Sequence, residues 1–146
     1  MKRGAHEGRA LIFPVLVVQS VENEAAFLQT VFEAQIGMVS HSEGGEVEHA
    51  EARIGESVIL LQRASTSLGA TSSVVHVATK NVQAALELAL KNGGETVPLP
   101  TSNSPQQAEA AVSDPHGNIW WIVPQDGKPS NEEVQRRLAE QRRHRL

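Results

Sequence analysis

The sequence contains no cysteine and no tyrosine, and its 146 residues include only two Trp and three Phe. Without cysteine no disulfide bond can stabilise the fold, which fits a cytoplasmic protein. No apolar run reaches the roughly 18 residues that a membrane-spanning helix requires. The initial Met-Lys-Arg is followed by Gly-Ala-His-Glu rather than by the apolar segment of an export signal. We therefore expect a soluble, unexported protein with no membrane partner.

Positive charge is scarce over most of the chain. Residues 1–127 contain 7 Lys and Arg against 14 Asp and Glu, whereas residues 128–146 contain 6 against 3. An acidic body does not attract a polyanion, and the arginines of the tail have no neighbouring aromatic residues on which bases could stack. We therefore expect no nucleic-acid partner.

One pattern of elements occurs twice, about sixty residues apart. The first copy predicts a strand, a helix ended by Gly37 and three further strands: Leu11–Val18, Glu22–Gln35, Met38–Glu43, Glu46–Ile54 and Ser57–Gln62. The second copy predicts the same order, with Asn81 as helix N-cap: Val74–Ala78, Val82–Lys91, Thr96–Leu99, Ala108–Ser113 and Ile119–Val123. Each copy is a βαβββ unit.

These units predict an α+β fold in which two tandem βαβββ modules form an open, curved mixed sheet around a cleft. Module one covers about residues 11–63 and module two about residues 73–124, within a single domain of residues 1–127. The remaining residues, 128–146, predict a basic C-terminal helix. Ser130 and Glu133 have the spacing of a capping box, and Val134 and Leu138 form only a narrow apolar stripe.

Two local motifs occupy matching places in the two modules. His49-Ala50-Glu51-Ala52-Arg53-Ile54-Gly55-Glu56-Ser57 lies in the first, and Asp114-Pro115-His116-Gly117-Asn118-Ile119-Trp120 forms a turn between two strands in the second. Together they resemble the vicinal oxygen chelate superfamily, which contains glyoxalase I, bleomycin-resistance proteins and extradiol dioxygenases. The resemblance covers residues 11 to about 124.

The resemblance implies a divalent metal held by His, Gln or Glu side chains on four strands of the concave sheet face, with substrate completing the coordination. Carried over to this chain, the four ligand positions fall on Phe13, Leu60, Val74 and Trp121. None of these side chains binds a metal. We therefore predict no metal and no other cofactor, and the resemblance is greatest to the bleomycin-resistance branch.

Strand alternation predicts which other side chains face the concave side. Ala50, Ala52 and Ile54 suit packing under the helix, so the intervening residues of that strand face a ligand. The predicted ligand-binding residues are Phe13, Val15, His49, Glu51, Arg53, Leu60, Gln62, Val74, His76 and Trp121. Of the tryptophan pair, Trp120 is predicted to face the helix and Trp121 to stack on a planar ligand.

Three functions remain open. The first is a small-molecule binding protein, most simply a homodimer, whose ligand is planar and aromatic or antibiotic-like. The second is a metal-dependent lyase, isomerase or dioxygenase that uses shifted ligands such as His49, Glu51 and His76. The third is a metal-free enzyme with His76 or His49 as general base. His116, in the turn, is expected to be solvated.

Overall fold

The computed structural model describes residues 11–100, 109–125 and 131–143. The elements, in chain order, are β1 (Val15–Val18), α1 (Val21–Phe32), β2 (Gln35–His41), β3 (Val47–Ile54), β4 (Ser57–Arg63), β5 (Val74–Thr79), α2 (Val82–Lys91), β6 (Glu95–Val97), β7 (Ala110–Ser113), β8 (Ile119–Pro124) and α3 (Asn131–Arg143). The first ten are two βαβββ modules, so the predicted α+β fold is confirmed.

The eight strands form two separate four-stranded mixed sheets with the same internal order. In module one the order is β1-β4-β3-β2, and in module two it is β5-β8-β7-β6. In each sheet the first strand of the module lies parallel to the last, while the remaining neighbours are antiparallel. The parallel pair requires a crossover, which α1 and α2 supply.

Both helices begin at a side-chain cap. The Ser20 hydroxyl accepts a hydrogen bond from the Asn23 backbone N–H, and Asn81 accepts one in the same way from Ala84. The end of α1 differs from the prediction, because the helix stops at Phe32 and not at Gln35. Glu33 takes a left-handed conformation (φ 56°) that ends the helix, and Gly37 lies within β2. A non-glycine residue in this conformation is uncommon, so the sequence pattern pointed to the glycine instead.

Several strand limits also differ from the prediction: β6 (Glu95–Val97) and β7 (Ala110–Ser113) are each shifted or shortened by one or two residues, and the largest differences are at β1 and β2. β1 starts at Val15, after Pro14, which has no N–H to offer to a sheet. β2 runs from Gln35 to His41 and carries an irregularity beside Met38, whose φ is 51°. Such bulges are common on edge strands, where they discourage pairing with another chain.

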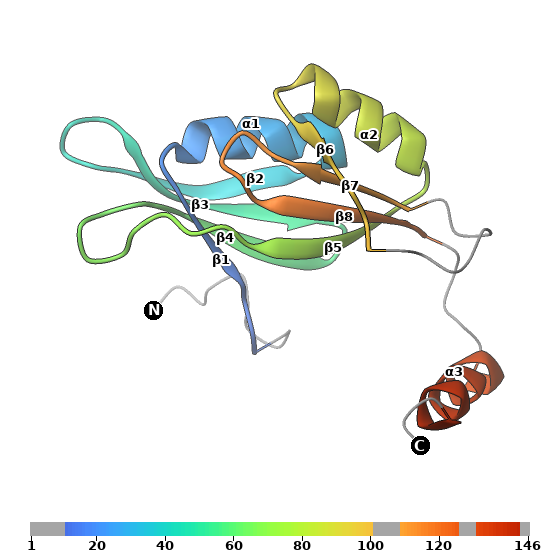
Figure 1. Ribbon diagram of the computed structural model, residues 1–146. Helices are drawn as coiled ribbons and strands as arrows, with labels where there is room; N and C mark the ends of the chain where they lie inside the picture. The colour runs from blue at the N-terminus through green and yellow to red at the C-terminus, as the bar shows by residue number, and fades with distance from the viewer. Residues whose placement is uncertain (1–10, 101–108, 126–130, 144–146) are drawn as a thin grey trace.

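The two helices cover the same side of the two sheets, as Figure 1 shows, and α1 and α2 contact each other. One core runs through both modules. It includes Leu16, Leu28 and Leu61 from module one, with Val112 and Trp120 from module two. The modules are therefore held together through their helices and through side chains beneath them.

Helix α3 lies apart from both sheets in the view of Figure 1. Its last turn carries Arg142 and Arg143, which favourably oppose the helix dipole. The predicted N-cap, Ser130, lies outside the described residues. No helix among the described residues is long and apolar enough to cross a membrane.

Candidate functional site

Successive strand residues alternate between the helix-covered face and the opposite face of each sheet, as the sequence predicted. Ala50 and Ala52 are buried under α1, while His49, Glu51 and Arg53 are half-buried on the other face of β3. In β8, Trp120 is fully buried and Trp121 is half-buried. We refer to the sheet faces that point away from the helices as the concave faces.

The concave face of module two carries an aromatic pair. His76 of β5 is the direct cross-strand partner of Trp121 of β8, and their ring centroids lie 4.5 Å apart. The Trp121 indole N–H donates a hydrogen bond to a Glu109 carboxylate oxygen at 2.8 Å. We call His76, Glu109 and Trp121 the aromatic site. Glu109 fixes the indole plane, and Val74, 64% exposed, extends the apolar surface beside it.

The concave face of module one carries a row of polar side chains. His49 pairs with Gln62 and Glu51 with Leu60 across β3 and β4, and Leu60 in turn pairs with Val15 of β1. Arg53 pairs with Val58, and Phe13 precedes β1. The structure therefore gathers the predicted ligand-binding residues into two groups, one on each module.

Within the described chain these two groups are not joined. None of the extensive contacts between described elements connects a strand of one sheet with a strand of the other. His49, Glu51 and His76, the shifted ligand set, do not bring their donor atoms within 4.8 Å of one another among the described residues. A single chain thus does not assemble that set.

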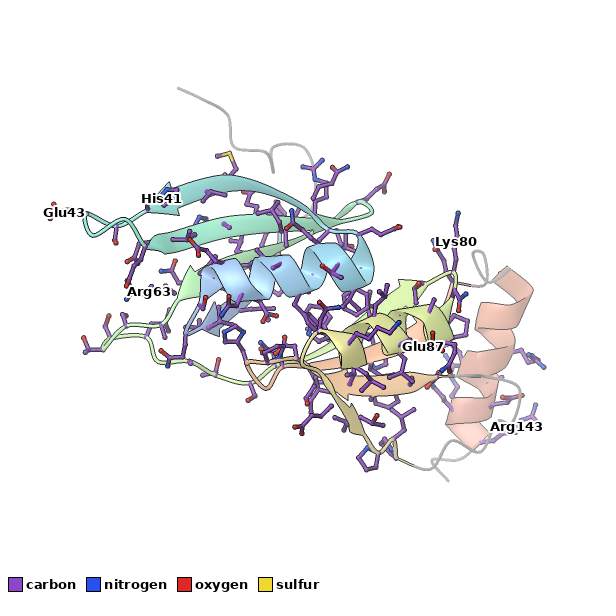
Figure 2. The ribbon with its side chains drawn as sticks, turned by 90° about the horizontal axis from the view of Figure 1, so that it is seen from above. His41, Glu43, Arg63, Lys80, Glu87 and Arg143 are labelled. Atoms are coloured by element: carbon purple, nitrogen blue, oxygen red, sulfur yellow. The ribbon has the colours of Figure 1, made fainter. Side chains whose placement is uncertain are left out.

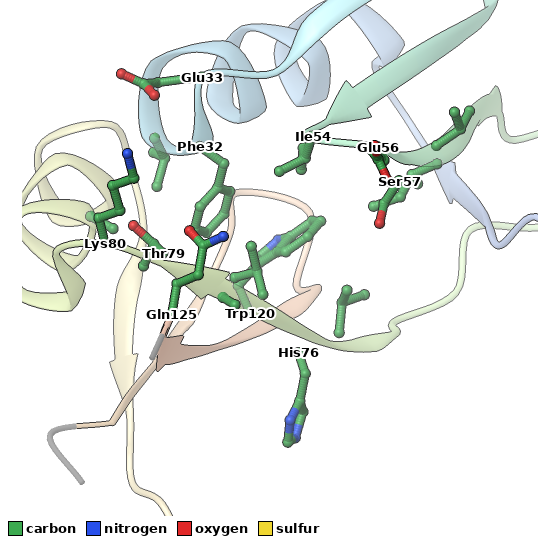
Figure 3. Close-up of a pocket in the computed structure, with 18 of the residues that line it drawn as sticks. Phe32, Glu33, Ile54, Glu56, Ser57, His76, Thr79, Lys80, Trp120 and Gln125 are labelled. Atoms are coloured by element: carbon green, nitrogen blue, oxygen red, sulfur yellow. The ribbon is translucent and has the colours of Figure 1, made fainter. Parts of the chain in front are cut away.

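A cleft of about 970 Å³ is lined by residues of both modules. Its floor contains the rings of Phe32 and Trp120, whose centroids lie 5.2 Å apart, and Figure 3 shows Glu56, Lys80 and Gln125 around it. Of the ten residues predicted to bind a ligand, Phe13, which precedes β1, and His76 line this cleft. In Figure 3 the His76 ring points away from Trp120, to the other side of β5. The aromatic site therefore meets the cleft only at His76, and Glu109 and Trp121 do not line it.

A second group of chemically active side chains lies between the modules, and it was not predicted. Glu24 of α1 is fully buried and Asp114 of the β7–β8 turn nearly so. The His116 ring nitrogen Nδ1 lies 2.8 Å from a Glu24 carboxylate oxygen. We call Glu24, Asp114 and His116 the carboxyl–histidine cluster. Their ligand atoms lie within 4.8 Å of one another, a spacing that a metal ion could also use.

The turn itself explains why Asp114 is buried. One of its oxygens accepts hydrogen bonds from the backbone N–H groups of His116 (2.8 Å) and Asn118 (3.1 Å). The other accepts the Trp120 indole N–H at 2.9 Å. Asn118 accepts the Ser73 N–H at 3.0 Å, which ties the turn to the start of β5. Gly117 supplies the positive φ of 82° that the turn requires.

The electrostatic consequence appears at Glu24. Burial, then the hydrogen bond to Asp114 and its negative charge, raise the pKa of Glu24 from 4.5 to about 10. The burial of Glu24 therefore favours its neutral, protonated form.

The expectation that His116 is solvated is wrong, because its side chain is only 12% exposed. The sequence contained an indication of this contact at Glu24, not at His116. Glu24 falls among Val21, Ala25 and Leu28 on the buried face of α1, and a carboxyl group there needs a polar partner.

Neither a protein-family profile nor a curated protein matches the sequence. Solved structures do match. A gene product of Arabidopsis thaliana is 22% identical over 78% of this chain and 98% of its own, with a TM-score of 0.60. TioX from Micromonospora sp. ML1 is 20% identical over 77% of this chain and 98% of its own, with a TM-score of 0.60. The fosfomycin resistance protein FosX from Listeria monocytogenes, complexed with Mn(II) and sulfate, is 18% identical over 88% of this chain and 97% of its own. Its TM-score is 0.65.

These structures belong to the superfamily that the two motifs resemble, and the sequence identities are low enough that the likeness concerns the fold. The β-α-β-β-β order repeats in both modules with matching strand pairing. The recognition made from the motifs is confirmed at this level: the chain has the fold of the vicinal oxygen chelate superfamily.

Proposed function

We propose that the protein binds a small planar aromatic molecule, antibiotic-like in size, on its concave faces, and that it does so without a metal. The observation that carries this proposal is the aromatic site. Trp121 and His76 present two neighbouring rings, and Glu109 holds the indole in a fixed orientation. Rings held in this way stack on flat ligands at little cost in side-chain entropy.

The chemistry of the surrounding side chains favours binding over catalysis at a metal. The four positions to which the superfamily assigns its metal ligands carry Phe13, Leu60, Val74 and Trp121, whose side chains supply apolar and aromatic surface. His49, Glu51 and Arg53 offer hydrogen bonds to polar groups at the edge of a ligand. A largely apolar wall with a few polar groups is typical of small-molecule sites.

We further propose that a homodimer completes this site. In one chain the two concave faces are not joined, and Val15 and Val74 are 44% and 64% exposed. Covering these faces with a second copy would remove apolar surface from water and bring the polar row of one module near the aromatic site of another. A cytoplasmic location stays a prediction from the composition.

Fluorescence titration tests the proposed function, with bleomycin as the first probe because its tail is planar and aromatic. We expect saturable quenching in the wild type and in a Trp120→Phe variant, and loss of most of the quenching in Trp121→Phe. Metal analysis of protein purified without chelator or immobilised metal supplies the second arm. About one equivalent of Mn, Fe, Ni or Zn, coupled to turnover, would favour the lyase, isomerase or dioxygenase with His49, Glu51 and His76.

A further inference from the structure

The carboxyl–histidine cluster joins the two modules. Glu24 belongs to α1 of module one, whereas Asp114 and His116 belong to the last turn of module two. Figures 1 and 2 show α1 lying beside that turn. The cluster does not overlap the aromatic site, because Trp121 points to the opposite face of β8 from Trp120.

Asp114 is an acceptor of several hydrogen bonds. Three N–H groups donate to its two oxygens, two to one oxygen and one to the other. A carboxylate has about four acceptor positions, so one position remains on the oxygen that accepts from Trp120. That position lets Asp114 take part in one further hydrogen bond without losing any of these three.

Glu24 is in the opposite situation. One of its oxygens contacts Nδ1 of His116, but the other, Oε1, is buried and has no N–H or hydroxyl donor among the described residues. An ionised Glu24 would leave that oxygen charged, buried and unpaired beside a second carboxylate. A proton on Glu24 removes the charge and supplies the donor for its side-chain hydrogen bond with Asp114.

We propose that Glu24 and Asp114 share one proton, and that this proton is a structural link between module one and module two. His116 completes the link, since its Nδ1 lies at hydrogen-bond distance from the second Glu24 oxygen. The raised pKa of Glu24 agrees with this arrangement. The proposal does not depend on the function proposed above.

Among the described residues, the other elements packed against Glu24 add no titratable group. The strands under α1 present Ala50, Ala52, Ile59 and Leu61, and the buried residues of α2 are Ala85 and Ala89, none of which titrates. Asp114 and His116 are therefore the titratable groups that face Glu24 in the described part of the chain. His116, 12% exposed, lies nearest to solvent.

The sign of the pH dependence follows from the direction of the shift. Glu24 holds its proton in the folded chain and loses it in the unfolded chain once the pH exceeds its ordinary pKa of 4.5. Unfolding then releases a proton, so the contribution of this group to stability is greatest below pH 4.5 and declines as the pH rises toward about 10.

Urea unfolding of the wild type and of Glu24→Gln between pH about 6 and about 9 tests the proposal. Relative to Glu24→Gln, the wild-type unfolding constant should rise by up to about tenfold per pH unit, the limit for one proton released. Glu22→Gln is the matched control, because Glu22 lies exposed on the same turn of α1, and its profile should follow the wild type. Parallel profiles for wild type and Glu24→Gln would overturn the proposal.

Two further measurements keep the test decisive if Glu24→Gln does not fold. The infrared spectrum of the wild type at pH about 8, where ordinary carboxyl groups are ionised, should contain the carbonyl band of a protonated carboxylic acid. Its absence would overturn the shared proton. If EDTA lowers the wild-type melting temperature and Zn²⁺ or Mn²⁺ restores it, the link is a metal ion and the proposal is equally wrong.

Discussion

Replacing each tryptophan in turn by phenylalanine separates the core of module two from its concave face. Trp120 is fully buried, packs on Phe32 at 5.2 Å and donates a hydrogen bond to the buried Asp114. Trp121 is half-buried and donates to Glu109. Because the chain has only two tryptophans, each variant leaves one fluorophore, and its emission reports on a known surface.

The two substitutions should differ in their effect on the free energy of unfolding. In Trp120→Phe the smaller ring leaves a cavity, which costs about 1–3 kcal/mol. Asp114 also loses a donor while remaining buried, which costs about another 1–3 kcal/mol. Trp121→Phe loses one partly exposed hydrogen bond and should cost about 1 kcal/mol or less.

Urea denaturation followed by circular dichroism measures these differences. With an m-value of about 1–3 kcal/mol per molar urea, Trp120→Phe should lower the midpoint by roughly 1–3 M, well beyond the change in Trp121→Phe. Bleomycin titration of the same proteins should show quenching only where Trp121 remains. If Trp121→Phe is the more destabilised variant, or if Trp120 alone responds to the probe, the assignment of faces on β8 is wrong.

Three further predictions concern metal, assembly and the aromatic site. Purified protein should carry far less than one transition metal per chain, and EDTA should leave its melting temperature unchanged; a stoichiometric metal with loss of stability on its removal would contradict binding without a metal. Sedimentation at micromolar concentration should show a dimer, and a monomer that still binds the probe would place the whole site in one chain. Glu109→Ala should change stability by less than about 1 kcal/mol, because Glu109 is partly exposed, yet weaken probe quenching by freeing the Trp121 ring; unchanged quenching would show that Glu109 does not orient it.

The sequence was sufficient for the fold because its cues are local and occur twice. Ser20 and Asn81, the two N-caps, lie sixty-one residues apart, as do Leu60 and Trp121 at matching positions in β4 and β8. Alternation along β3 separated Ala50 and Ala52 from Glu51 without any knowledge of the tertiary structure. Boundaries were less certain, since Glu33 ends α1 in a conformation that the sequence pattern assigns to glycine.

The candidate site was harder to predict, because it depends on contacts between segments far apart in the chain. The pairing of His76 with Trp121 follows from strand register. Glu109 lies within the predicted strand Ala108–Ser113, just before the observed β7, but strand alternation did not identify it as the hydrogen-bond partner of Trp121. The contact between Glu24 and His116 joins residues 92 positions apart. Periodicity places Glu24 on the buried face of α1, yet it does not say which side chain of module two will meet it.

Comparing the two modules shows that the contact between Glu24 and His116 has no counterpart at the matching positions, where α2 would meet the turn between β3 and β4. At the position sixty-one residues after Glu24, α2 carries Ala85, which is buried without any polar partner. The turn between β3 and β4 contains Gly55 and Glu56, both exposed, whereas the turn between β7 and β8 contains Asp114 and His116, which reach α1. An apolar pair at these two places would pack equally well and would need no proton. With the shared proton proposed above, the polar pair instead costs stability increasingly as the pH rises and Glu24 approaches ionisation.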